Sequence, residues 1–187
     1  MIKLAKSSTP DNATALLVVD MQNGFVNHNS EHIVPNIRRL LELGAWSTVV
    51  FTRFLNQPDS PYVRWIGWSR FMASPEIDII EQLEPFAEQI VDKHGYSAFV
   101  PEVGKILENA LVKRIVVCGV ATDGCVLKTA VDAFERNIEP VVVADACASH
   151  AGAAIHDAAL LLIPRFIGRK QVRSTDEVIA EVGRPSA

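Results

Sequence analysis

The sequence predicts an α/β fold with a mainly parallel sheet, because short apolar runs alternate with segments of helical periodicity. The clearest run covers residues 115–118 and ends in Gly119 and a small polar loop, after which a helix-compatible segment begins. Such a run is typical of a strand buried on both faces of a parallel sheet. The 187 residues are enough for one domain with a substantial core and short for two. We therefore expect a single domain over residues 1–187.

The first half of the chain predicts a strand, a helix and a second strand. Residues 15–19 are apolar and end at Asp20, and residues 47–54 are rich in β-branched side chains. Between them, residues 33–42 carry apolar side chains at helical spacing, and Gly44 follows. A strand, a helix and a strand in this order indicate a right-handed parallel crossover.

The segment between Leu55 and Pro75 interrupts the alternation. It mixes Pro, Asp and Ser with aromatic residues, among them Trp65 and Trp68. A long aromatic loop can cover a binding site, or it can pack over one end of the sheet or in a subunit interface. Trp65 and Trp68 are therefore candidates for contact with a substrate, with both readings of the loop left open.

The second half of the chain continues the alternation. The expected strands are residues 89–92, 115–118 and 140–144. The expected helices are residues 103–111, 125–136 and 150–162. Residues 166–172 add a late strand or extended segment, and Ser174 with Glu177 has the spacing of a capping box at the start of a last helix ending at Val182.

Composition and charge favour a cytoplasmic protein. The formal net charge is -4 and the basic residues are scattered, so neither nucleic acid nor a membrane is expected as a partner. No apolar stretch of signal-peptide length follows Lys3 and Lys6, and the longest apolar runs are too short to span a bilayer. The 3 cysteines show neither a CxxC motif nor zinc-finger spacing, which indicates a reducing compartment.

Asp20, Lys93 and Cys125 stand at the carboxyl ends of three separate expected strands. These ends share one edge of a parallel sheet, so the three side chains can converge in one crevice. Cys125 lies among turn residues at the start of a helix, where free N–H groups and the helix dipole favour the thiolate form. Cys118 and Cys147 lie in or beside apolar runs and fit a role in the core. Lys93 would lower the thiol pKa, and Asp20 would accept the thiol proton as a general base.

Four segments of the chain carry a resemblance to a known family. They are LLVVDMQNGF at 16–25, DKHGYSAF at 92–99, CGVATDGCV at 118–126 and VVVADACAS at 141–149. Together they resemble the isochorismatase-like cysteine hydrolases, a superfamily that includes nicotinamidases and N-carbamoylsarcosine amidases. The resemblance implies a Rossmann-like, doubly wound sheet with helices on both faces.

The resemblance also implies roles for individual residues. It makes Asp20, Lys93 and Cys125 a catalytic triad. It further implies a cis peptide between Val120 and Ala121, and an oxyanion hole formed by the N–H groups of Ala121 and Cys125. Relatives in this superfamily are often homo-oligomers, so a dimer or tetramer is expected.

The activity implied by the resemblance is hydrolysis of a small amide-type molecule, a carboxamide, ureido compound or lactam, through a thioester on Cys125. Phe25, Tyr96 and Phe99 adjoin the motif residues and are candidates either for the pocket wall or for ordinary packing. Nicotinamidases carry a metal-binding Asp and two His just after the second strand, where this chain has TRFLN at 52–56. We therefore expect no metal and no cofactor.

Two alternatives remain within the family. Isochorismatases proper hydrolyse a vinyl ether without needing a thiol, so Cys125 favours amide chemistry without proving it. An inactive binding or scaffold protein could keep the same fold, although intact Asp20, Lys93 and Cys125 argue against it. A cysteine-based phosphatase would need an arginine six residues after the nucleophile, and that position holds Val131.

Overall fold

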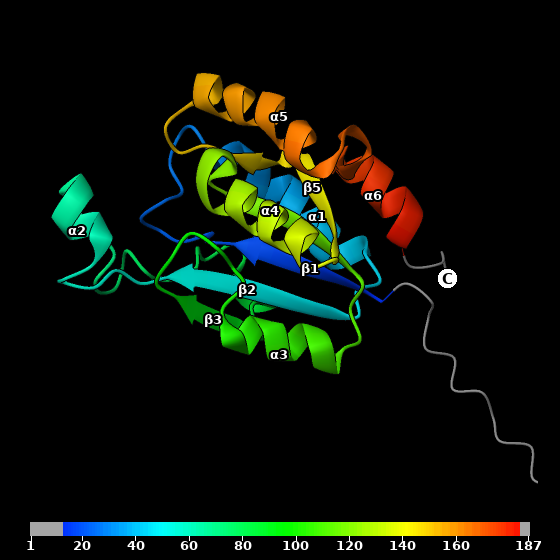
Figure 1. The fold of residues 1–187 in the computed structure, drawn as a ribbon, viewed down its shortest axis with the longest axis horizontal. Coiled ribbons are helices and arrows are strands. Elements are labelled where there is room, and N and C mark those ends of the chain that lie inside the picture. Colours follow the sequence, from blue (N-terminus) through cyan, green and yellow to red (C-terminus); the bar gives the residue numbers. More distant parts are fainter. Residues whose placement is uncertain (1–12, 184–187) are drawn as a thin grey trace, which may run out of the picture.

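The computed structural model describes residues 13–183 and contains one parallel sheet, as the alternation of apolar runs predicted (Figure 1). The sheet has 6 strands in the order β3-β2-β1-β4-β5-β6. These strands are β1 (Thr14–Val19), β2 (Thr48–Phe54), β3 (Ile90–Lys93), β4 (Arg114–Val120), β5 (Glu139–Ala148) and β6 (Val172–Arg173). Residues 1–12, on which the expectation about a signal peptide rests, lie outside the described part of the chain.

Helices cover both faces of this sheet. They are α1 (Val34–Leu43), α3 (Pro101–Asn109), α4 (Leu127–Glu135), α5 (Ala153–Ile167) and α6 (Thr175–Val182), while α2 (Pro61–Ile66) lies beyond one edge (Figure 1). Helix α4 packs against α5, and α1 packs against α6. In Figure 1, α4 lies in front of the sheet and α1 behind it, which is the doubly wound arrangement expected from the sequence.

The centre of the sheet determines where a site can form. All residues of β1 are buried, and β4 is buried along nearly its whole length, as expected for central parallel strands. From β1 the chain crosses to β2 on one side, whereas β4 pairs with β1 on the other side. The carboxyl ends of β1 and β4 therefore flank a topological switch point, where open α/β sheets bind their ligands.

The aromatic segment between Leu55 and Pro75 contains a helix that the sequence analysis did not predict. Helix α2 begins after Ser60, whose side chain accepts a hydrogen bond from the N–H of Val63, and ends at Gly67 with φ 70°. The signals for this helix are therefore present in the sequence. They are a capping serine, a proline in the first turn and a glycine after the last turn. Figure 1 shows α2 projecting from the carboxyl edge of the sheet.

Three elements in the second half have bounds that differ from those expected. Strand β5 continues through a register shift to Ala148, so Asp145 lies inside the strand, where its carboxylate accepts hydrogen bonds from the N–H and hydroxyl of Thr175. Helix α5 continues past Pro164 to Ile167 and ends at Gly168, which has φ 96°. Of the expected late strand over residues 166–172, only Val172 belongs to a strand, β6 (Val172–Arg173).

The expected capping box is present. The hydroxyl of Ser174 accepts a hydrogen bond from the N–H of Glu177, and the Glu177 carboxylate accepts one from the N–H of Ser174. Over residues 13–183, the structure has no helix with both the length and the apolar character needed to cross a membrane.

Candidate active site

Asp20, Lys93 and Cys125 meet at the carboxyl edge of the sheet. Asp20 follows β1, Lys93 is the last residue of β3, and Cys125 lies in the turn after β4. The Lys93 Nζ is 2.8 Å from the Asp20 Oδ2 and 3.3 Å from the Cys125 Sγ. Asp20 and Lys93 have no solvent exposure, and Cys125 is 8% exposed. An ammonium ion thus lies between a carboxylate and a thiol in a site that excludes most water.

Asp20 is held by the neighbouring strand. Its backbone N–H points to the carbonyl of Thr52 at 3.2 Å, and its Oδ1 accepts a hydrogen bond of 2.7 Å from the Thr52 hydroxyl. Asp20 has φ 51°, a left-handed conformation that aspartate tolerates better than most residues. Because Thr52 occupies Oδ1, the other oxygen, Oδ2, is the one that faces Lys93 and can accept a proton. Thr52 was not predicted as a site residue; a threonine at the end of an apolar strand was its only signal.

Lys93 reaches the site across the end of β2. Besides Cys125, its ammonium donates to the carbonyl oxygens of Gly95 at 2.8 Å and Tyr96 at 3.2 Å. Burial lowers the Lys93 pKa most strongly, but the charges and hydrogen bonds of Asp20 and Cys125 together raise it above its ordinary value. Lys93 therefore remains an ammonium ion and neutralises Asp20.

The Cys125 thiol differs from its expected state. Burial raises its pKa most strongly and the Asp20 carboxylate raises it further, while Lys93 only partly opposes these effects. Lys93 thus lowers the thiol pKa, as expected, but burial and Asp20 outweigh it and the net shift is upward. The reason is that Lys93 is already matched by Asp20, so a thiolate would be a second buried anion. The thiol keeps its proton and has a carboxylate beside it that can take the proton when a substrate is attacked.

The turn that carries Cys125 is tightly constrained. The peptide bond between Val120 and Ala121 is cis, and residues Thr122–Val126 form a π-helical turn before α4 begins. The carbonyl of Ala121 accepts hydrogen bonds from the N–H groups of Gly124 and Val126 at 3.0 and 3.1 Å. Gly119 has φ 109°, and a Cβ there would lie 2.2 Å from the carbonyl oxygen of Val19. Only glycine fits this approach of β4 to β1.

Helix α5 supports the same turn from the side. The Thr122 hydroxyl is 2.8 Å from the Nδ1 of His156, which lies in α5. Burial lowers the His156 pKa, which favours the neutral ring at this contact. The turn is therefore fixed by β4, by its own hydrogen bonds and by α5.

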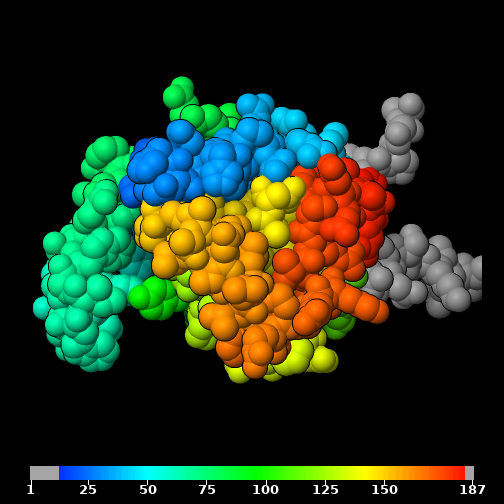
Figure 2. Space-filling view, turned by 90° about the horizontal axis from the view of Figure 1, so that it is seen from above, coloured from blue at the N-terminus to red at the C-terminus, as the bar shows by residue number. Residues whose placement is uncertain are grey.

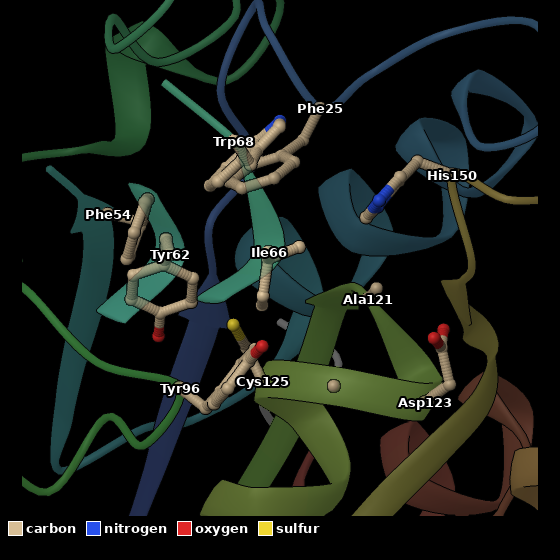
Figure 3. A pocket seen from close by; sticks show the side chains of 11 residues that line it. Phe25, Phe54, Tyr62, Ile66, Trp68, Tyr96, Ala121, Asp123, Cys125 and His150 are labelled. Atoms are coloured by element: carbon tan, nitrogen blue, oxygen red, sulfur yellow. The ribbon is translucent and has the colours of Figure 1, made fainter. Parts of the chain in front are cut away.

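An aromatic pocket of about 260 Å³ opens above the thiol (Figure 3). Its walls are formed by Phe25, Phe54, Tyr62, Ile66, Trp68, Tyr96, Ala121, Asp123, Gly124, Cys125 and His150. The Cys125 sulfur points into the space below Ile66 and Tyr62, and Phe25 and Trp68 lie stacked on the opposite side. A small molecule in this pocket would have its reactive group against the thiol.

Three of the five aromatic residues predicted for substrate contact line this pocket, namely Phe25, Trp68 and Tyr96. Trp65 does not, because Tyr62 and Ile66 occupy the inner side of α2 while Trp65 points outward with 79% exposure. Phe99 also lies outside it and packs beneath Arg136, whose guanidinium carbon is 4.8 Å from the ring centroid.

Several pocket residues were not predicted from the sequence. Tyr62 packs edge-on against Tyr96, with ring centroids 5.2 Å apart, and burial raises the pKa of its hydroxyl. His150 lies 5.3 Å from the Phe25 ring, and burial lowers the His150 pKa. Asp123 was part of the quoted CGVATDGCV segment but was not assigned a role. The helical spacing of Tyr62 and Ile66 was the one signal that could have identified the inner side of α2.

Among the residues that the structure describes, no group of three or more His, Cys, Asp or Glu side chains is arranged to hold a metal ion. His150, Asp123 and Cys125 line the pocket, and Cys125 also contacts Lys93.

Comparisons with known proteins agree on one family. The family model described as "Isochorismatase domain" matches residues 14–168. The ureidoacrylate amidohydrolase RutB of Serratia proteamaculans is 27% identical over 83% of this chain and 77% of its own. In structure, the chain is similar to N-carbamoylsarcosine amidase from Thermoplasma acidophilum, with a TM-score of 0.73, 26% identity and coverage of 87% of this chain and 96% of the other. A cysteine hydrolase from Pseudomonas syringae pv. phaseolicola gives a TM-score of 0.75 at 26% identity, with coverage of 91% and 92%.

Proposed function

The chain belongs to the isochorismatase family, and we propose that it is a cysteine amidohydrolase that cleaves a C–N bond in a small carboxamide, ureido compound or lactam. The observation that carries this proposal is the position of the Lys93 Nζ, 2.8 Å from the Asp20 Oδ2 and 3.3 Å from the Cys125 Sγ, at the floor of the aromatic pocket. A nucleophile, a base and a cation in contact are what acyl transfer from an amide requires.

The first half-reaction forms a thioester. The Cys125 Sγ attacks the carbonyl carbon of the amide while its proton passes to the Asp20 carboxylate. The carbonyl oxygen takes the negative charge, for which we assign the N–H groups of Ala121 and Cys125 as donors; both residues line the pocket. Asp20 then gives its proton to the nitrogen, the C–N bond breaks, and ammonia or an amine leaves.

The second half-reaction returns the enzyme to its starting state. Asp20, again a carboxylate, accepts a proton from water as the water oxygen attacks the thioester carbon. The C–S bond breaks, the acid is released, and the proton on Asp20 returns to the Cys125 sulfur. Lys93 stays charged throughout, since the charges and hydrogen bonds of Asp20 and Cys125 raise its pKa despite its burial.

The charges around the pocket favour an uncharged substrate. No lysine or arginine is among the described residues that line it, whereas Asp123 contributes a carboxylate. Burial lowers the pKa of His150, so this histidine supplies no cation near neutral pH. The charge of Arg70, which is not among the residues lining the pocket, also lowers the His150 pKa. The Arg70 guanidinium is itself paired with Glu76 at 2.7 Å. Ureidoacrylate, the substrate in the name of the RutB relatives, carries a carboxylate. No unpaired cation among the described pocket-lining residues could bind that carboxylate.

The experiment that tests the activity is release of ammonia or amine from matched pairs of amides. Each pair has the same carbon skeleton, one member being neutral and the other bearing a carboxylate, and each is given to wild type and to Cys125→Ala. We expect turnover of neutral members, loss of that turnover in Cys125→Ala, and no effect of a chelator. Turnover that survives in Cys125→Ala would contradict the thioester mechanism.

Charge selection can be measured without knowing the substrate. Iodoacetamide and iodoacetate alkylate the same thiol but differ in charge, so the ratio of their rates at Cys125, relative to a small free thiol, reports the field in the pocket. We expect this ratio to favour iodoacetamide, and Asp123→Asn to shift it toward iodoacetate by roughly fivefold, the effect of about 1 kcal/mol from one solvated charge. Glu135→Gln, an exposed residue at the far end of α4, is the matched control. A ratio unchanged by Asp123→Asn would contradict the proposal that the pocket favours uncharged substrates, and would leave the proposed amidohydrolase activity untouched.

A further inference from the structure

A groove adjoins the aromatic pocket at its rim. It has a volume of about 440 Å³, and its walls include Tyr96, Asp123, Gly124, Leu127, Val131 and Phe166. The first three of these residues also line the pocket above the Cys125 thiol, so the groove begins where that pocket opens. Figure 2 shows α5, in orange, running across one face of the molecule with no described segment over it. The groove lies between the last turns of this helix and α4.

The groove is mainly apolar and follows the start of α4. Gly124, Leu127 and Val131 are three and four residues apart, so they form a row about 10 Å long on one side of the π-helical turn and the helix. Phe166 completes the wall from α5, and 53% of its surface is exposed. A molecule that fills the pocket above the thiol could therefore continue along an apolar surface.

Gly124 stands at the junction of the pocket and the groove, and the fold does not require a glycine there. Its backbone is not left-handed, and a Cβ would lie 4.0 Å from the Ala121 Cβ and 4.0 Å from the Tyr96 Cδ1, which are ordinary contacts. Gly119 differs, since its positive φ and its approach to β1 exclude any side chain. The missing side chain at position 124 instead leaves open the passage between Ala121 and Tyr96.

The buried floor determines which end of a substrate reaches this passage. In the proposed mechanism Asp20 protonates the leaving nitrogen, so that nitrogen must face Asp20. Because Asp20 and Lys93 have no solvent exposure, a large substituent on the nitrogen would have to enter the core. The acyl part of the substrate must then extend the other way, toward the mouth of the pocket, where Gly124 opens into the groove.

We propose that the groove binds the acyl chain of the substrate, and that the preferred substrate is a primary amide with an apolar chain. Water converts it to ammonia and the corresponding carboxylic acid. This inference rests on the proposed function and specifies its substrate class. Among the described residues that line the groove, Lys128 carries the only positive charge, and its ammonium is paired with Asp132. An acidic chain end would find no free cation there, whereas Leu127, Val131 and Phe166 offer apolar contact.

Chain length tests the assignment. Ammonia release is measured for the straight-chain amides from butanamide to octanamide, and the slope of kcat/KM against chain length is compared among variants. In wild type we expect kcat/KM to rise by about threefold for each added methylene, since the groove removes it from water. Phe166→Ala removes a wall and Gly124→Ala narrows the entrance, so both should flatten the slope.

Phe134→Ala is the matched control. It removes the same side chain from another exposed position, 55% exposed, on α4 and outside both the pocket and the groove, so the slope should stay as in wild type. Thermal unfolding checks that each variant is folded. A flat slope in wild type, a wild-type slope in both Phe166→Ala and Gly124→Ala, or a slope lost in Phe134→Ala would each overturn the proposal.

Binding separates the groove from the reaction. Cys125→Ala is titrated calorimetrically with the same amides, with and without Phe166→Ala. We expect binding to tighten with chain length only where Phe166 is present. Chain-dependent binding together with no ammonia release by wild type would contradict the proposed function and support the groove. Ammonia release with binding that ignores chain length would do the reverse.

Discussion

The floor and the cover of the pocket differ in what holds their side chains in place. The floor consists of Asp20, Lys93 and Cys125, which stand at or just beyond the ends of three strands of one sheet. Each is fixed by short polar contacts, including the Lys93 to Asp20 ion pair at 2.8 Å and the Thr52 hydroxyl on Asp20 at 2.7 Å. Positions of this kind follow from the topology of the sheet.

The cover consists of Tyr62, Ile66 and Trp68, which come from α2 and the residue after its closing glycine. Ring contacts hold it, such as Tyr62 with Trp68 at 6.0 Å between centroids and Trp68 with Phe25 at 6.1 Å. These contacts are apolar and weakly directional, so they tolerate rearrangement better than an ion pair does. Under the proposed function, we infer that the floor determines which reaction occurs and the cover determines which molecule is admitted.

The largest expected effect comes from removing the nucleophile. Cys125→Ala should lower turnover by at least about 10⁴-fold, because loss of a nucleophile commonly removes nearly all of the chemical step. The thiol contributes little to folding, so the thermal midpoint should change little, and both quantities can be measured on the same preparation. Residual turnover within tenfold of wild type would show that the floor does not define the reaction.

The ion pair of the floor should be visible in stability. Lys93→Met leaves Asp20 buried without its cation, which should cost about 3–5 kcal/mol in the free energy of unfolding. The double variant Lys93→Met/Asp20→Asn removes both charges and should lose distinctly less. Urea unfolding of the two variants and of wild type measures this difference. Equal losses of unfolding free energy in the single and double variants would show that Lys93 and Asp20 are not energetically coupled, contrary to their geometry.

The sequence predicts the floor of the pocket better than its cover. The convergence of Asp20, Lys93 and Cys125 could be predicted, since carboxyl ends of parallel strands share one edge of a sheet. The thiol pKa could not, because it depends on whether Lys93 is shared with a carboxylate at ångström distances. Trp65 and Trp68 could not be separated either. Their roles depend on the bounds of α2, a helix of 6 residues whose capping signals are weaker than a repeating apolar pattern.

The state of the thiol gives a prediction that separates reactivity from catalysis. Asp20 raises the Cys125 pKa through its charge and its hydrogen bond, whereas Lys93 lowers it. Asp20→Asn should therefore lower the thiol pKa, enlarge the thiolate fraction at neutral pH and speed alkylation by iodoacetamide, by up to about tenfold for each unit of decrease. Turnover should nevertheless be lost, because no base remains to relay the proton. Slower alkylation in Asp20→Asn would contradict the assignment of Asp20 as the group that keeps the thiol protonated.

The smallest expected effects compare two tryptophans three residues apart in the cover segment. Trp68 lines the pocket and stacks on Phe25, so Trp68→Ala should raise KM by roughly tenfold, equivalent to about 1.4 kcal/mol of lost apolar contact, with kcat nearly unchanged. Trp65 points outward from α2 beneath Arg64, so Trp65→Ala should leave both constants within about twofold. The two variants remove the same side chain from neighbouring positions and control for each other. If Trp65→Ala raised KM as much as Trp68→Ala, α2 would have to turn its outer side to the substrate, and the cover would be a moving element rather than a fixed wall.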